Sequence, residues 1–336
     1  MRTWPISLVL LTGCLAILAG TAQASHAPWE DEILELFATL PVQDAGRVKP
    51  LDTYARFSLL RINAKRTVTL PESRQRLSAL EWLLDCFFYP ETAKTYPVFS
   101  VDSSEVIIAM RLPAHAEKRD RYAYNELAPG RDTLMELATA YQRIPVAERQ
   151  RVQRQIITLA DNIFFFEQLI HFFDVARESF SVTGDSEFAQ AFPGGPQGIS
   201  AVLEAGPKAM LAIRDRFSDL SEEAMRVEAE AAGALLDAVG RVADIAHALA
   251  LLPPLDEDDQ EWWTPGEVCA MAFSLQQPIP LPIDLMQSLE RLAGKPDDRA
   301  AFLEELRHFH GGVAGQAVAR GEYARIPLEV SFYRGQ

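Results

Sequence analysis

The chain has 336 residues, of which 24% are charged and 48% hydrophobic. These fractions are ordinary for a globular protein and exclude wholesale disorder. The net charge of −15 at pH 7 argues against nucleic-acid binding, because a phosphate backbone requires a basic surface. It argues in the same way against simple electrostatic attachment to an anionic membrane, and three cysteines are too few for a disulfide framework.

Residues 1–24 have the pattern of an export signal. Arg2 precedes an apolar run over 6–20, and Ala22-Gln23-Ala24 supplies the small residues that signal peptidase accepts. The apolar run is shorter than the roughly 20 residues of a membrane span, which disfavours a retained anchor. We therefore expect cleavage after Ala24 and a periplasmic protein, peripheral to the inner membrane.

The three cysteines leave two questions open. Leu11-Thr12-Gly13-Cys14 resembles a lipobox, so a lipoprotein acylated at Cys14 is the alternative to ordinary cleavage. The apolar run continues past Cys14, which favours ordinary cleavage. In an oxidising compartment Cys86 and Cys269 can pair, but both lie in apolar surroundings that suit two buried free thiols equally well.

Helical periodicity dominates the mature chain. It predicts a mainly α fold, a helical periplasmic domain with one or two short strands. Expected helices cover 33–40, 51–62, 78–88, 146–180, 201–252 and 283–320, the last with Gly311-Gly312 as a break. Short strands are expected at 97–101 and, from its alternating pattern, at 325–333. Charged residues interrupt 146–180 too often for a membrane span, which indicates a buried core helix.

A Gly- and Pro-rich segment, 181–200, is the best candidate for an internal boundary. It separates an N-terminal helical region, 25–180, from a C-terminal helical region, 201–336, that is expected to end in a short strand. The boundary rests on this composition alone. The sequence contains no internal repeat of 20–50 residues.

Candidate catalytic groups are few. His171 lies one helical turn from Glu167 and near Asp174, which is compatible with a ligand or a general base but more typical of a structural histidine. His308 and His310 are the only close histidine pair, and residues two apart on a helix point to different sides. No nucleotide-binding, zinc-protease or serine-hydrolase motif occurs. We therefore expect no enzyme activity, no metal and no firmly bound cofactor.

The most distinctive segment is Leu40–Arg56, which contains PVQDAGRVKPLDT. Asp44-Ala45-Gly46 can turn the chain, with Gly46 free to adopt positive φ. The alternation around Val48 predicts a short extended piece. Asp52 or Thr53 is placed to cap the helix that follows.

The same segment is a candidate docking surface, because Arg47 and Lys49 offer cationic hydrogen-bond donors within an acidic protein. The alternative is a well-formed turn that leads into a helix. The candidate interaction residues are Gln43, Asp44, Gly46, Arg47, Lys49, Pro50, Asp52 and Thr53.

This segment resembles the one that opens the extracytoplasmic domain of system II (Ccs-type) cytochrome c assembly proteins. Weaker similarities follow in the family's order along most of the mature chain, at 82–101, 253–265 and 326–333. In that family, membrane helices deliver haem to the outer face, where it is joined to the cysteines of an apocytochrome.

The chain departs from that family in one major respect. The family continues into membrane helices after the segment that resembles 326–333, and this sequence contains no tryptophan-rich haem segment. The family's haem ligands have no matching positions here. The resemblance therefore implies a non-catalytic accessory subunit that acts with a separate membrane cytochrome c synthetase, which handles the haem, and with apocytochrome c as a further partner. The alternatives are a general periplasmic binding or chaperone module, or a periplasmic enzyme.

Overall fold

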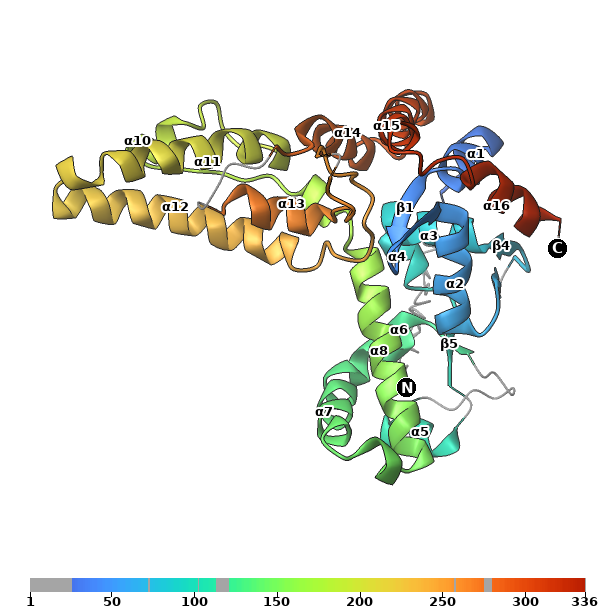
Figure 1. The fold of residues 1–336 in the computed structure, drawn as a ribbon. Coiled ribbons are helices and arrows are strands. Elements are labelled where there is room, and N and C mark those ends of the chain that lie inside the picture. Colours follow the sequence, from blue (N-terminus) through green and yellow to red (C-terminus); the bar gives the residue numbers. More distant parts are fainter. Residues whose placement is uncertain are drawn as a thin grey trace, which may run out of the picture.

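The computed structural model describes residues 26–71, 73–101, 103–112, 121–256, 258–274 and 280–335, apart from the side chain of Phe217. The predicted signal sequence and Cys14 lie outside the described residues. The fold is mainly α, as predicted, with short two-stranded sheets. An arm and a lobe extend from a central body in different directions (Figure 1).

The central body contains the described residues between 26 and 93. Its helices surround a core to which α1, α2 and α3 contribute most of their buried apolar side chains. The elements are α1 (Asp31–Ala38), β1 (Pro41–Asp44), β2 (Arg47–Pro50), α2 (Leu51–Asn63), β3 (Thr67–Thr69), β4 (Arg76–Ser78), α3 (Ala79–Phe88) and α4 (Pro90–Ala93).

Local sequence explains where α3 and α2 begin. Ser78 caps α3 through a reciprocal pair of hydrogen bonds with Glu81. The helix therefore begins directly after Ser78, the residue at which the sequence predicted its start. The predicted cap of α2 is wrong. The chain passes directly from β2 into the helix, so Pro50 is the N-cap residue. Its side chain has no group that could form a capping hydrogen bond. Asp52 therefore lies within the first turn, where its carboxylate accepts a 2.7 Å hydrogen bond from Arg56.

The β1–β2 hairpin confirms the predicted turn. The two strands pair antiparallel with Pro41 opposite Pro50 and Asp44 opposite Arg47, which leaves a two-residue turn. Ala45 and Gly46 both have positive φ, 52° and 72°. Two consecutive residues of this kind are typical of a type I′ turn, whose twist matches that of the paired strands.

The lobe is built around α8 (Arg151–Ile170), which is shorter than the helix predicted over 146–180. Its inward face carries Ile156, Ile163 and Phe166, all of them buried. The elements are β5 (Phe99–Ser100), α5 (Ser104–Ala109), β6 (Arg121–Tyr122), α6 (Tyr124–Leu127), η1 (Ala128–Gly130), α7 (Arg131–Gln142), η2 (Val146–Glu148), α8 (Arg151–Ile170) and α9 (Asp174–Arg177).

Among the described residues, Arg151–Arg177 is long and apolar enough to cross a membrane, by length and composition alone. Within the fold, 61% of its most apolar window is buried, as in the core helix of a soluble protein. The prediction of a core helix here agrees with that burial.

The arm follows the predicted loop. A short helix forms inside 181–200, and an antiparallel bridge between Phe180 and Gln197 draws the ends of the segment together. Two long helices then run side by side (Figure 1). The elements are α10 (Glu187–Gln190), α11 (Ile199–Asp215), η3 (Phe217–Asp219), α12 (Glu222–Ala243) and α13 (Pro265–Ala272).

The last helices return to the body, so the region 201–336 is divided between the arm and the body. They are α14 (Ile283–Ala293), α15 (Arg299–Ala319) and α16 (Ile326–Arg334). The predicted break at Gly311-Gly312 is wrong, because α15 continues through both glycines. A Cβ at Gly312 would lie 2.9 Å from Leu285 Cδ2, so glycine lets α14 and α15 approach closely.

The predicted C-terminal strand is also wrong. Residues 326–334 form α16, with Pro327 in its first turn, a position that proline favours. Ile326 and Val330 are buried, and their spacing of four is that of one helical face. The sequence pattern was ambiguous because Leu328 and Phe332 are also apolar, although they are exposed.

The turn geometry yields a first prediction. Gly46→Ala should lower the free energy of unfolding by about 1 kcal/mol, because Gly46 has a left-handed backbone conformation. Gly233→Ala is the matched control, since it lies inside α12 with no atom within 4 Å of an added Cβ. That control should stabilise the protein by up to about 1 kcal/mol. Urea unfolding measures both, and equal effects would contradict the turn assignment.

Candidate functional site

The β1–β2 hairpin lies where three distant parts of the chain meet. It packs against α2 and α15, and β2 also contacts α16 (Figure 1). The predicted site residues differ in exposure along it. Gly46 and Arg47 are exposed at the tip, Gln43, Asp44 and Lys49 are half-buried, and Pro50, Asp52 and Thr53 are buried.

Gln43 connects the hairpin to the segment that leads into α13. Its backbone N–H donates to Ala250 O over 2.8 Å. Its side-chain amide donates to Gln260 O over 2.8 Å and accepts from the Trp262 N–H over 3.0 Å. Because both the amide nitrogen and the amide oxygen of its side chain bond to the segment before α13, Gln43 is a structural clamp rather than a free surface contact.

The tryptophan pair held by this clamp belongs to the core. Trp262 and Trp263 are both buried, and Trp263 forms a backbone bridge with Leu252. The indole N–H of Trp262 donates to Glu322 over 3.1 Å. The segment 253–265, which carries one of the similarities named above, is therefore attached directly to the hairpin.

Arg47 connects the hairpin tip to α16. Its guanidinium donates two hydrogen bonds to the Glu329 carboxylate, over 2.8 and 3.0 Å. Burial raises the pKa of Glu329, but the Arg47 bonds outweigh this effect and hold the pKa below its ordinary value. Glu329 is thus ionised at neutral pH, and the pair links two segments 282 residues apart.

The second predicted cation, Lys49, is also paired. Its ammonium group, on β2, donates a 2.6 Å hydrogen bond to the Asp44 carboxylate on β1. Arg47 and Lys49 are therefore not the two free cationic donors that the sequence suggested. What remains accessible is the hairpin tip, which presents Asp44, Ala45, Gly46 and the outer part of Arg47.

Among the described residues, His171, Glu167 and Asp174 do not come together as a catalytic set. His171 Nδ1 lies 2.7 Å from Asp174, as the sequence predicted. Glu167 is directed elsewhere, because its carboxylate accepts hydrogen bonds from Arg131 and Tyr124. Glu167 therefore does not act together with His171 and Asp174, as the enzyme alternative would need.

Metal ligation has no site among the described residues. No group of three His, Cys, Asp or Glu side chains is arranged to hold a metal there. His310 contacts Thr39 Oγ1 over 3.2 Å, whereas His308 is exposed on a different side of α15. The two histidines therefore do not act together.

The two cysteines among the described residues, Cys86 and Cys269, are buried free thiols. Burial raises the pKa of Cys269 to about 12 and that of Cys86 well above its ordinary value. Thiols with such pKa values remain protonated at neutral pH and react slowly. Of the two alternatives that the sequence left open, the structure contains the free thiols.

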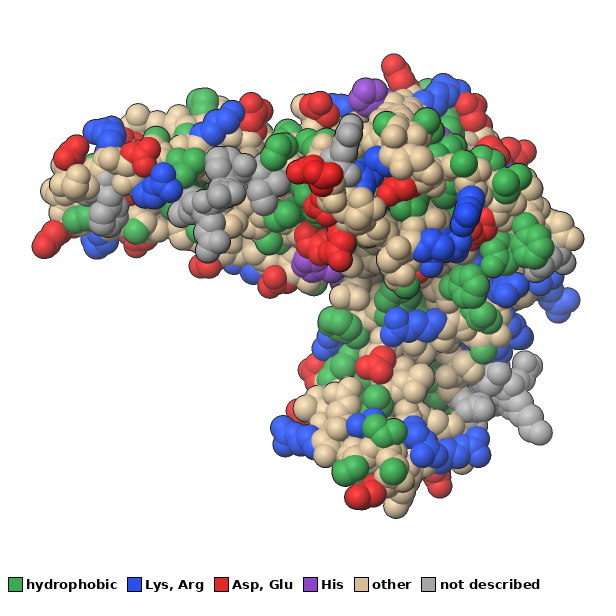
Figure 2. Space-filling model, viewed as in Figure 1, with side chains coloured by type: hydrophobic (Ala, Val, Ile, Leu, Met, Phe, Trp, Pro, Cys, Tyr) green, Lys and Arg blue, Asp and Glu red, His purple; other side chains and the backbone are tan. Residues whose placement is uncertain are grey.

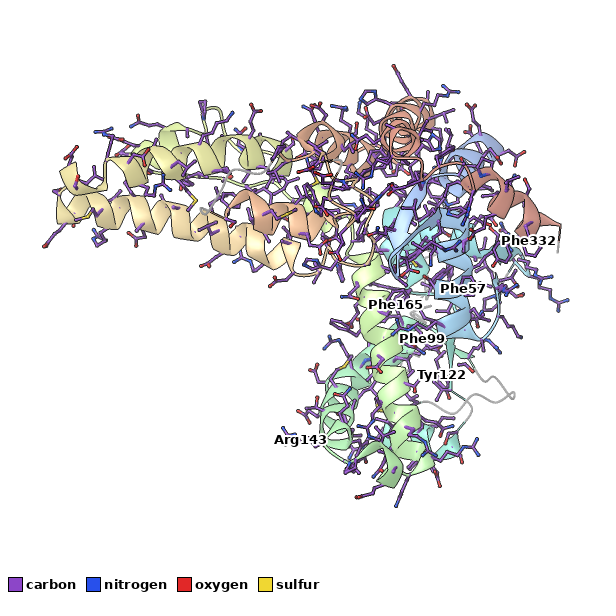
Figure 3. All side chains as sticks on the ribbon, in the orientation of Figure 1. Phe57, Phe99, Tyr122, Arg143, Phe165 and Phe332 are labelled. Carbon is purple, nitrogen blue, oxygen red and sulfur yellow. The ribbon has the colours of Figure 1, made fainter. Side chains whose placement is uncertain are left out.

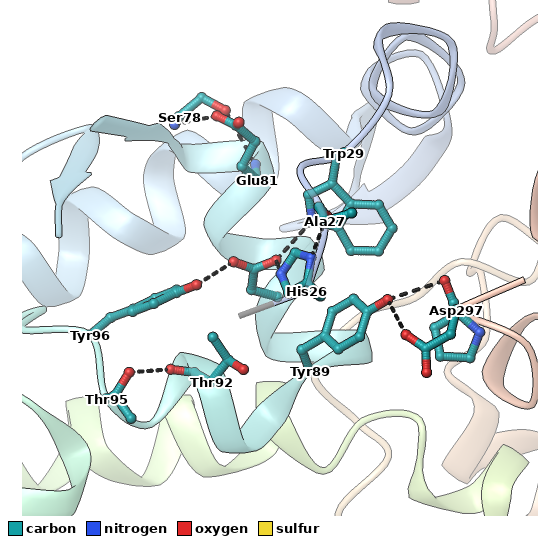
Figure 4. Close-up of polar contacts among 12 residues, drawn as sticks. His26, Ala27, Trp29, Ser78, Glu81, Tyr89, Thr92, Thr95, Tyr96 and Asp297 are labelled. Atoms are coloured by element: carbon teal, nitrogen blue, oxygen red, sulfur yellow. Dashed lines mark hydrogen bonds and ion pairs between the residues drawn. The ribbon is translucent and has the colours of Figure 1, made fainter. Parts of the chain in front are cut away.

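A carboxylate that the sequence did not single out, Asp85 of α3, is buried in the body, and Figure 4 shows the polar contacts around it. Asp85 accepts hydrogen bonds from the Trp29 indole over 2.8 Å and from the Tyr96 hydroxyl over 2.6 Å. His26 Nε2 lies 2.8 Å from the same carboxylate, and its ring stacks on Tyr89 at 3.8 Å. Asp85 thereby attaches His26 and Trp29 to α3. An acid inside the apolar run Leu83–Phe88 was the available signal.

A cavity of about 240 Å³ lies in the lobe, between α8 and the segment around α5. Arg151, Arg154 and Gln155 line one side, and Ser100 and Ser103 line the other. None of the predicted interaction residues lines this cavity, so it is separate from the hairpin site.

Comparison with known proteins identifies no relative: no family model, no curated protein and no solved structure matches this chain. The similarity to system II cytochrome c assembly proteins therefore rests on the quoted segments and stays a prediction.

The Asp85 cluster yields a prediction about pH. Burial lowers the pKa of His26, but the Asp85 carboxylate outweighs that effect and raises it above 6.5. The stabilisation from the charged pair should therefore be fully present below about pH 6.5 and be lost as pH rises through the folded-state pKa. His26→Gln should cost roughly 1–2 kcal/mol in acidic solution and less in alkaline solution, measured by urea unfolding.

The exposed His308 provides the matched control for that experiment. His308→Gln should leave the pH dependence of stability unchanged. A cost for His26→Gln that is constant across the pH range would contradict the charged pair with Asp85.

Proposed function

We propose that this protein is a periplasmic, non-catalytic accessory subunit of system II cytochrome c maturation. It would act beside a separate membrane synthetase subunit that handles the haem, with apocytochrome c as a further partner. The primary support is the segment Leu40–Arg56, whose PVQDAGRVKPLDT run resembles the opening of the family's extracytoplasmic domain.

One observation of the structure carries the proposal further. Two other segments that resemble the family, 253–265 and 326–333, are attached to the hairpin by Gln43 and Arg47. Short similarities scattered over 300 residues have little weight individually. Because these three meet at one place, they are better understood as parts of one structural unit than as unrelated coincidences.

The proposed docking surface consists of the hairpin tip and the part of α16 that carries Glu329. Pro50, Asp52 and Thr53 are buried, so they support this surface without contacting a partner. The tip presents backbone groups of Ala45 and Gly46 beside the Arg47–Glu329 pair. A rigid hairpin with a paired arginine is suited to bind a protein loop, because little conformational freedom is lost on binding.

The role we propose for this chain in haem attachment is to hold and position its partners. We assign no haem ligand to it, and the partner subunit supplies the haem. The general chaperone alternative needs no cytochrome subunit, so the identity of the bound partner distinguishes the two.

A charge-swap variant tests the docking surface. R47E/E329R keeps the ion pair but exchanges its charges, so the stability should change by no more than about 1 kcal/mol. In a strain that lacks the wild-type gene, this variant should support several-fold less covalent haem in c-type cytochromes than the wild-type protein. Haem staining of cell extracts, together with recovery of the membrane subunit by affinity purification from native membranes, measures the effect.

The matched control is R226E/E223R, which exchanges an exposed pair on the arm. It should behave as the wild-type protein does in both assays. Unchanged c-type cytochromes after deletion of the gene would overturn the proposal, as would affinity purification that recovers no cytochrome assembly subunit.

A further inference from the structure

Exposed apolar side chains gather where α16 crosses α2. Leu328 and Phe332 lie four residues apart on the outer side of α16 and are 71% and 61% exposed. Phe57 projects from α2 with 48% exposure, and its ring centroid lies 6.5 Å from that of Tyr333 (Figure 3). Ile326 and Val330 already anchor α16 to the body, so the outer side chains are not needed to hold the helix.

A basic hairpin lies beside this apolar patch. Residues 64–78 contain four cations and one acid, Glu72, in a chain whose net charge is −15. Figure 2 shows Lys and Arg side chains next to hydrophobic ones along the right-hand edge of the molecule. The four cations, all of them exposed, are Lys65, Arg66, Arg74 and Arg76.

These cations differ from the other arginines near the patch. Arg47, Arg56 and Arg334 are neutralised by Glu329, Asp52 and Glu35. Among the described side chains, none of the four cations of the hairpin has a carboxylate within 4.0 Å. They are therefore available to an external anion.

We propose that this face, formed by the outer sides of α16 and α2 and by the β3–β4 hairpin, binds the surface of an anionic phospholipid bilayer. Projecting Phe and Leu side chains can insert at the boundary between headgroups and acyl chains. The neighbouring Lys and Arg side chains can bind lipid phosphates. The inference goes beyond the proposed function, which requires only a protein partner.

Two considerations favour a bilayer over a protein partner. A stable protein interface buries about 800 Å² on each side with complementary packing, whereas this face offers a few separate apolar side chains on a convex helix. A bilayer needs no fixed complementary shape. The acidic remainder of the chain does not prevent binding, because exposed charges further away than about 8 Å are largely screened at physiological ionic strength.

Vesicle co-sedimentation tests the inference with the purified protein. Vesicles of phosphatidylcholine with phosphatidylglycerol should bind it, whereas vesicles of phosphatidylcholine alone should bind it much more weakly. K65E/R74E should weaken binding to the anionic vesicles by at least about tenfold, because each cation near the surface contributes to attraction. Phe332→Asp should also weaken binding to the anionic vesicles. The part of the wild-type binding that persists at high salt, which the apolar side chains supply, should be lost in this variant.

Matched variants at distant exposed positions control for nonspecific effects. R143E/R241E reverses two exposed cations that lie in the lobe and the arm. Ile108→Asp adds a charge at a side chain that is 75% exposed on α5. Both controls should bind anionic vesicles as the wild-type protein does, and thermal unfolding should show that all variants are folded.

The inference is overturned if the wild-type protein does not bind anionic vesicles, or if the controls weaken binding as much as the face variants. It is also overturned if Phe332→Asp abolishes self-association in sedimentation velocity while no vesicle binding occurs, since the face would then join two copies. Because the vesicles contain no protein, failure here is distinguishable from failure of the proposed cytochrome function.

Discussion

The register of the β1–β2 hairpin is the constraint on which the arrangement of the body depends. Because Pro41 lies opposite Pro50 and the turn contains only Ala45 and Gly46, the strands cannot shift without reversing every side chain. This register directs Gln43 toward the segment before α13 and Arg47 toward α16. A shift of one residue would remove both connections. The segment before α13 and helix α16 would then no longer be bonded to the hairpin.

Charge is distributed to match this arrangement. The Asp85 carboxylate is buried, but three donors around it satisfy its oxygens, so the charge holds the segment before α1 in place instead of destabilising the core. At the surface, the cations near the tip of the β1–β2 hairpin are paired, whereas those of the β3–β4 hairpin have no carboxylate partner among the side chains that the structure describes. A net charge of −15 therefore describes the average of the chain and not the electrostatics of each face.

The two proposals assign neighbouring faces to different partners. The hairpin tip and the Arg47–Glu329 pair would meet a protein, and the outer stripe of α16 would meet lipid. Both faces include residues of α16: Glu329 belongs to the first, and Leu328 and Phe332 belong to the second. This short helix therefore connects the two faces. A protein held at a bilayer by one side of this helix would present the hairpin tip to a membrane subunit in the same plane, without any change in its own structure.

Local sequence determined the parts of this fold that depend on neighbouring residues. The periodicity of 78–88 and the glycine of the Asp44–Arg47 turn identified α3 and the hairpin, and the apolar pattern of 146–180 identified a core helix. Only the tertiary structure decided the rest. The alternation over 326–333 suits a strand or a helix, and burial of Ile326 and Val330 selects the helix. Arg47 seemed to be a free docking cation because its partner, Glu329, is 282 residues away, and no local pattern encodes a contact formed by packing.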